Sequence, residues 1–164
     1  MLDFLLQYYR AFYASKGAST AYQFVPETFI EMVKNDNVLL AGTFGENGVN
    51  AVIMFAYTPY IGEYILNVSL PDGQQNSVAL LWYGICQLKR RNVRWLNLGG
   101  GIKPGDGVAQ FKKRFGGEVF RLSSVKQIYD DDSYRSLCKS VNADPADITG
   151  YFPSYRSPNK VVDN

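Results

Sequence analysis

The side chains available for chemistry in this sequence exclude one large group of reactions, because the 164 residues contain no histidine. A Ser-His-Asp or Cys-His arrangement cannot form within such a chain, and neither can a histidine-ligated zinc site. Proton transfer then has to use tyrosine, aspartate, glutamate, lysine, a chain terminus or water. We therefore expect no metal, and we regard the common histidine-dependent hydrolases as disfavoured.

Polar residues interrupt two apolar stretches of the chain. Asn67 and Ser69 are two residues apart, so they share one face if their stretch is a strand. Because buried polar groups need partners, this face is a candidate substrate groove, although exposure at a strand end explains both residues about as well. Asn97 lies in the second stretch. Tyr64 and Glu63 are candidates for acid and base catalysis, but Glu63 follows a turn, and simple surface exposure also explains it.

The most distinctive local pattern is a glycine triplet, with Lys112 in the next segment expected to be a helix. Gly99, Gly100 and Gly101 allow backbone conformations and close approaches that a side chain would forbid. An ordinary strand-to-helix turn accounts for them as well. Lys112 lies in the following segment beside other basic residues, so it either serves a site or is merely exposed.

Hydrophobic periodicity and turn residues predict the elements that position these side chains. We expect helices over residues 2–14, from Pro26 to residues 35–37, and over 76–91, 107–115 and 130–141. We expect strands over residues 38–44, 49–57, 63–69, 93–98 and 118–129. The first three strands should form an antiparallel meander, and the strand after the long helix should pair in parallel with an earlier one. The fold class is therefore α/β (α+β), with a mixed, mostly antiparallel sheet flanked by helices.

Length and composition indicate one globular domain over residues 1–164, with an irregular tail over about 143–164. The net charge of +2 argues against a dedicated nucleic-acid binder. The two cysteines form no CxxC pair and fit free thiols in a reducing compartment. No stretch approaches the roughly 20 apolar residues that span a bilayer, and the start lacks the basic region of a signal peptide. These features favour a cytoplasmic protein.

The segments at residues 93–101 and 107–117 resemble the GNAT acyltransferase superfamily in its Fem-type (FemAB-like) branch. That branch has a strand ending in Gly-Gly, a loop with an aspartate, and a helix reading Phe-Lys-x-x-Phe-Gly-Gly. The matching residues here are Gly99, Gly100, Asp106, Phe111, Lys112, Phe115, Gly116 and Gly117. A Phe-Pro-x-Tyr-Arg tail at residues 152–156 is also similar to this group. The resemblance covers residues 37–117 well and the flanking helices loosely.

The resemblance implies an N-acyltransferase that moves an acyl or aminoacyl group to an amine of an amino sugar, a cell-envelope precursor or a peptide. The donor would be an acyl-CoA or an aminoacyl-tRNA, which is the one nucleic acid we consider. Lys112 would then place positive charge near the developing oxyanion. From this resemblance and from the polar and glycine patterns above, the candidate substrate-binding residues are Asn67, Ser69, Asn97, Gly99, Gly100, Gly101, Asp106, Tyr155 and Arg156. The last two could close the cleft or bind an anionic substrate.

Two departures from the family pattern leave an alternative open. A GNAT domain normally begins with a strand, whereas the chain starts at the expected first helix, and Fem-type proteins usually contain two such domains. We therefore expect a missing first strand and either a missing N-terminal GNAT-like domain or a homodimer. The loop at residues 69–77 also has one glycine where acetyl-CoA-dependent members have two. The alternative is a non-catalytic GNAT-like domain that serves binding or assembly.

Overall fold

The computed structural model describes residues 1–18, 22–101 and 105–157. It divides the chain into a first compact unit, Met1–Gly117, and a second unit that begins at Glu118. None of the helices in the described residues is long and apolar enough to cross a bilayer. All of the expected site residues except Tyr155 and Arg156 belong to the first unit.

The first unit is built around a four-stranded sheet with the order β1-β2-β3-β4. The strands are β1 (Val38–Gly45), β2 (Gly48–Tyr57), β3 (Ile61–Ser69) and β4 (Trp95–Asn97). β1, β2 and β3 form an antiparallel meander, and β4 pairs in parallel with β3. This order and these directions confirm the predicted mixed, mostly antiparallel sheet. The parallel pairing follows because a helix carries the chain back across the sheet between β3 and β4.

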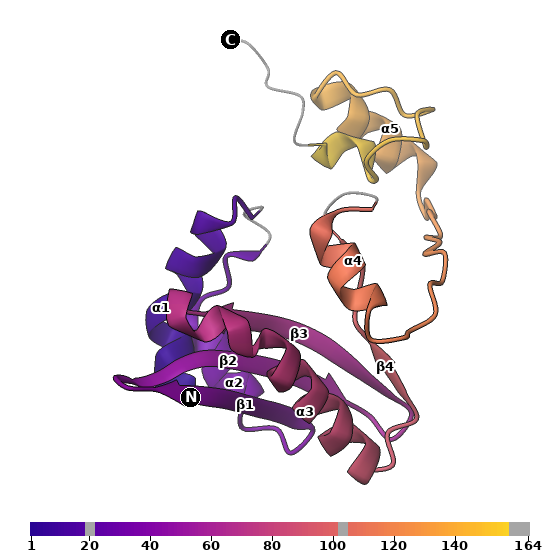
Figure 1. Cartoon of the computed structure of the whole chain (residues 1–164). Coiled ribbons are helices and arrows are strands. Elements are labelled where there is room, and N and C mark those ends of the chain that lie inside the picture. Colours follow the sequence, from indigo (N-terminus) through magenta and orange to yellow (C-terminus); the bar gives the residue numbers. More distant parts are fainter. Residues whose placement is uncertain (19–21, 102–104, 158–164) are drawn as a thin grey trace. The chain divides into compact units, whose positions relative to one another are not determined.

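Helices cover both faces of this sheet (Figure 1). On one face lie α1 (Leu2–Ser15) and α2 (Pro26–Met32), and on the other lies α3 (Ser77–Arg90). Successive residues of β2 serve the two cores in turn, since Val52 and Met54 pack with α1 and α2 while Ile53 and Phe55 pack with α3. Apolar and aromatic side chains make up both cores, so the sheet is a closely packed platform for the residues at its edge.

Two shorter elements of the first unit carry or adjoin the expected site. The 3-10 helix η2 (Pro71–Asn76) runs from β3 directly into α3, and α4 (Gly107–Lys113) follows β4. Phe111 and Phe115 of the α4 region contact each other and pack against the core that α3 covers, as their spacing of four predicts.

The prediction of a strand over residues 118–129 is wrong, because the structure contains no strand there. The apolar side chains Val119, Leu122 and Val125 of this segment are exposed. Alternating apolar residues indicate a preference for extended backbone, but a strand forms only when a second backbone provides hydrogen bonds.

The second unit has a small core of its own around the helix α5 (Asp131–Ser140). Tyr134 and Cys138 of α5 are buried, and the Tyr134 hydroxyl donates to Ser154 Oγ over 3.0 Å. Ser154 begins the 3-10 helix η3 (Ser154–Arg156), which lies in the expected irregular tail; residues 158–164 of that tail lie outside the described residues. Lys126 Nζ donates to the carbonyl oxygens of Ile148 and Gly150, and these bonds join the segment over residues 118–129 to the loop that precedes η3.

Candidate functional site

The sheet opens where β4 stops pairing with β3. The pairs run from Ile61 with Trp95 to Glu63 with Asn97, whereas β3 continues to Ser69. The rest of β3 therefore has an edge that β4 does not cover. At the start of this open part, Phe55 pairs with Tyr64 and Met54 pairs with Leu66, which leaves Ile65 as the extra residue of a β-bulge. A bulge bends its strand and redirects side chains, and bulges are frequent beside active sites.

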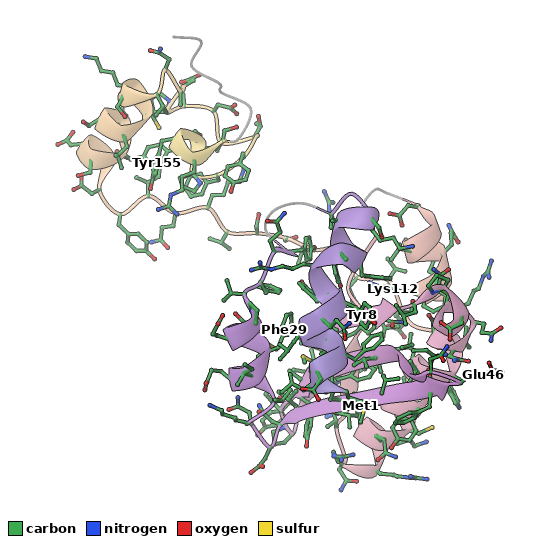
Figure 2. The ribbon with its side chains drawn as sticks, turned by 90° about the vertical axis from the view of Figure 1, so that its left-hand side faces the viewer. Met1, Tyr8, Phe29, Glu46, Lys112 and Tyr155 are labelled. Carbon is green, nitrogen blue, oxygen red and sulfur yellow. The ribbon has the colours of Figure 1, made fainter. Side chains whose placement is uncertain are left out.

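Lys112 lies against this opening. Its Nζ donates a hydrogen bond of 2.8 Å to the carbonyl oxygen of Gly100 and lies 5.3 Å from the centre of the Tyr64 ring. Burial lowers the pKa of Lys112, and the nearby Asp106 carboxylate partly opposes that shift. Figure 2 labels Lys112 in the first unit. The lysine is thus half-buried and held in place, which is what a cation that stabilises a transient negative charge requires.

Tyr64, which lies beside Lys112, is a candidate proton donor. Its ring packs edge-on against Phe55, and burial raises the pKa of Tyr64 to about 12. The phenol therefore keeps its proton at neutral pH and can donate a hydrogen bond or a proton, but it is a poor base.

Tyr13 of α1 is a residue that the sequence pattern alone did not single out for the site. Burial, followed by the neighbouring Tyr9, Tyr64 and Tyr22, raises the pKa of Tyr13. Tyr64 of β3 is thus one of the groups that act on Tyr13 electrostatically. The only sequence signal was the unusual density of tyrosine in the first helix.

Asn67 adds a hydrogen-bond acceptor on the same face of β3. Asn67 pairs with Ile53 and Tyr64 pairs with Phe55, and both partners belong to the core that α3 covers. Asn67 Oδ1 is buried and has no hydrogen-bond partner among the described residues. An unpaired buried acceptor costs about 1 to 3 kcal/mol, so such a group in a native protein calls for an explanation. A substrate N–H group would satisfy it.

Ser69 shares the face of Asn67 by register, as predicted, because it pairs with Ala51. It lines a shallow surface pocket of about 190 Å³ between the end of α1 and the start of η2. The pocket wall includes Tyr8, Phe12 and Lys16 of α1 and Gln74 of η2. The lining of this pocket does not include Tyr64, Gly100 or Lys112. A role of Ser69 in the site stays a prediction.

The other expected residues around the glycine loop bond mainly within the chain. Asn97 Oδ1 accepts a 2.8 Å hydrogen bond from the Gly99 N–H, and Asp106 Oδ1 accepts one of 2.8 Å from the Ala109 N–H as the N-cap of α4. Gly99 has a φ of +67°, which glycine adopts without strain. These contacts position the loop and the helix that carries Lys112.

Within the first unit, one expected residue is not brought to Lys112. Glu63 is adjacent to Tyr64 in β3, so its side chain points to the opposite face of the sheet. Tyr155 packs edge-on against Tyr134 in the second unit, and the Arg156 guanidinium lies over the Tyr155 ring. A contribution of Tyr155 and Arg156 to the site therefore stays a prediction.

A partly buried polar network, which the sequence pattern did not reveal, links the connection between β3 and α3 to the β1–β2 hairpin. Thr43 Oγ1 donates to Asn50 Oδ1 over 2.8 Å, Asn50 Nδ2 donates to Asp72 Oδ2 over 3.1 Å, and Asn76 Nδ2 donates to Thr43 Oγ1 over 3.1 Å. Asn50 is only 5% exposed. The one available signal was an asparagine inside an apolar strand. The network fastens η2 to the β1–β2 hairpin, and it places a carboxylate where a phosphate-binding loop would need donors.

No group of three or more Cys, Asp or Glu residues that could hold a metal ion occurs among the described residues.

No protein-family model and no curated protein sequence matches this chain. Solved structures do match. One is a ribosomal-protein-alanine N-acetyltransferase from Brucella melitensis biovar Abortus 2308, with a TM-score of 0.56 and 12% identity over 77% of this chain and 93% of that chain. Another is a possible acetyltransferase from Clostridium difficile 630, with a TM-score of 0.59 and 11% identity over 79% of this chain and 92% of that one.

A third similar structure is an aminoglycoside acetyltransferase from an uncultured soil metagenomic sample, in complex with sisomicin. Its TM-score is 0.55, with 12% identity over 79% of this chain and 89% of that one. At such low identities the likeness concerns the fold. The GNAT-like fold expected from the sequence is thereby confirmed.

Proposed function

We propose that this protein transfers an acyl group from an activated donor to an amine, with Lys112 as the cation that stabilises the tetrahedral intermediate. The observation that carries this proposal is the Lys112 ammonium, held by the Gly100 carbonyl beside Tyr64 at the open edge of β3. The GNAT-like fold supports it, because two similar structures are named as acetyltransferases of amine-bearing acceptors.

In the proposed reaction the amine nitrogen attacks the acyl carbon, and the C–N bond forms as the carbonyl oxygen becomes negative. Lys112 has three N–H donors, and within the described residues one of them is bonded to Gly100, which leaves two for the oxyanion. The bond from the acyl carbon to the leaving sulfur or oxygen then breaks. Tyr64, protonated at neutral pH, gives its proton to the leaving atom and recovers one from the amine through water.

The identities of the donor and the acceptor form a more specific part of the proposal. The Phe-Lys helix supports a Fem-type enzyme, in which an aminoacyl-tRNA or an acyl-CoA donates to an amino sugar, a cell-envelope precursor or a peptide in the cytoplasm. Asp72 in the β3–α3 connection weighs against a diphosphate bound at that loop. The Asn67 acceptor suits an amide or amine N–H of either substrate.

Replacement of Lys112 tests the proposal most directly. Purified protein would be incubated with acetyl-CoA or aminoacyl-tRNA and with an amino sugar or a peptide amine, and amide product would be measured by mass spectrometry. We expect Lys112→Ala to lower kcat by about 100-fold or more, since one oxyanion donor is typically worth that much. Lys113→Ala, which removes an exposed neighbouring charge, should stay within about twofold. Equal turnover in Lys112→Ala and the unmodified protein would refute the assignment.

The second candidate function is a non-catalytic GNAT-like domain for binding or assembly, as a homodimer or with a further GNAT-like domain. The closed network around Asn50 and Asp72 favours it, because acetyl-CoA-dependent members use that loop to hold the donor. Thermal-shift measurements with acetyl-CoA, longer acyl-CoAs and UDP-sugars separate the two, since a ligand that binds only the folded state raises its midpoint. A clear shift with an acyl donor would remove this candidate.

A further inference from the structure

Three side chains converge on the glycine loop from its two sides. Asn97 Oδ1 accepts from the Gly99 N–H over 2.8 Å, and Lys112 Nζ donates to the Gly100 carbonyl over 2.8 Å. The Asp106 carboxylate lies so close to Gly101 that a Cβ at this glycine would be 2.1 Å from Asp106 Oδ1 and 2.7 Å from its Cγ. No side chain fits at position 101 while Asp106 stays where it is.

Asp106 is fixed by the helix that carries the lysine. Its Oδ1 accepts from the Ala109 N–H and so caps α4, on which Lys112 lies six residues after the cap. One carboxylate therefore sets both the start of the helix and the position of the loop whose carbonyl receives the Lys112 ammonium. A fixed distance between loop and helix is what keeps the cation in a single place.

We infer that the loop Gly99–Gly101 is a mount for the Lys112 ammonium, and that Gly101 and Asp106 are positioning residues that act through Lys112. The catalytic consequence rests on the proposed acyl transfer, but the mount itself does not. This assignment differs from a direct role in substrate binding, which the sequence pattern suggested for both residues.

An anion-binding loop explains the same glycines less well. Such a loop offers free N–H groups, whereas the Gly99 N–H is bonded to Asn97. A carboxylate against Gly101 would also repel a phosphate.

The neighbouring glycine provides a matched control. Nothing lies within 4 Å of a Cβ placed at Gly100, and positive φ angles occur at Gly99 but not at Gly100. Gly100→Ala therefore adds the same methyl group one residue away without a clash or backbone strain. Gly101→Ala forces Asp106 or the loop to move.

The experiment compares the full-length protein with Gly100→Ala, Gly101→Ala, Asp106→Gly and the double variant Gly101→Ala/Asp106→Gly. The ammonium of Lys112 is titrated by NMR through its Cε in protein with 13C-labelled lysine, and Lys112→Arg identifies the resonance. Gly101→Ala and Asp106→Gly should lower the titration midpoint, because Asp106 supports the charged form of Lys112. Gly100→Ala should leave it unchanged.

Kinetics give a second readout. Gly101→Ala should lower kcat by roughly 10- to 100-fold with unchanged KM values, because the cation is misplaced while the substrates still bind. In the Asp106→Gly background the clash is gone, so adding Gly101→Ala should lower kcat little further. If Gly101→Ala alone does not fold, the comparison of Asp106→Gly with the double variant still tests the inference.

Equal titration midpoints in Gly100→Ala and Gly101→Ala would overturn the inference. So would an equal loss of kcat on adding Gly101→Ala to the unmodified protein and to Asp106→Gly. If Lys112→Ala leaves turnover intact while the midpoint still moves in Gly101→Ala, the acyl-transfer proposal fails and the mount stands.

Discussion

Two connections lead from a strand to a helix in the first unit, and both contain glycine for different physical reasons. In η2, between β3 and α3, a Cβ at Gly73 would lie 2.2 Å from the backbone oxygen of Asn50. In the loop after β4, a Cβ at Gly101 would meet the side chain of Asp106 instead. The first glycine lets two backbones pack together, and the second lets a carboxylate lie against a loop.

The difference between the two connections extends to their polar groups. At η2 the Asp72 side chain bonds to Asn50 of β2, which bonds to Thr43 of β1. Beside the loop after β4, Lys112 of α4 has N–H donors beyond the one that bonds to Gly100 in the described part of the chain. A connection that contains glycine is therefore structural when its polar groups bond among themselves, and a candidate site when a charged donor remains available.

The largest effect is expected where backbone meets backbone. Gly73→Ala should lower the free energy of unfolding by about 3 kcal/mol, because a backbone oxygen cannot move aside as a flexible side chain can. Urea denaturation measures the change, with Gly100→Ala expected within about 0.5 kcal/mol as its control. A Gly73→Ala protein as stable as the control would mean that η2 does not lie against β2 as described.

The second effect concerns pH and the lysine site alone. Burial raises the pKa of Tyr64 from 10.0 to about 12, so the folded state holds this proton more tightly than the unfolded state. That contribution is complete below pH 10 and is lost as the pH rises towards 12. Between pH 9 and pH 11 the unmodified protein should lose about 1.4 kcal/mol more stability than Tyr64→Phe, measured by urea denaturation at each pH. Parallel pH profiles for the two proteins would contradict the burial of the Tyr64 hydroxyl.

The smallest effect is expected at Gly99. Its φ of +67° makes an L side chain strained, while the nearest atom to an added Cβ, Lys112 Nζ, would be at an ordinary 3.5 Å. Gly99→Ala should therefore cost about 1 kcal/mol of stability, well below the cost at Gly73. If Gly99→Ala destabilised the protein as much as Gly73→Ala, backbone conformation rather than packing would govern both connections.

The meander was predictable from the sequence because each of its strands pairs with its neighbour along the chain. Turn residues and apolar alternation report such local pairing, as at Gly45 and Gly48 between β1 and β2. The segment at residues 118–129 has the same alternation, but its place depends on a partner backbone that local pattern does not specify.

The site was predictable only in part for a similar reason. Lys112 and the glycine triplet stand out in the sequence through a family resemblance. The hydrogen bond from Lys112 to Gly100 and the contact of Asp106 with Gly101 depend on tertiary geometry. Asn50 carries no such signal, because a single asparagine in an apolar strand is compatible with exposure or with burial.

The hydrogen bonds of Lys126 within the second unit affect where a protease can cut the chain. A trypsin-like protease must take a lysine side chain into its own acidic pocket, and this side chain already donates to the carbonyl oxygens of Ile148 and Gly150 beside the Phe152 ring. Arg121 lies exposed in the same extended segment. We therefore expect cleavage after Arg121 before cleavage after Lys126, because Lys126 becomes accessible only after its hydrogen bonds to Ile148 and Gly150 have broken.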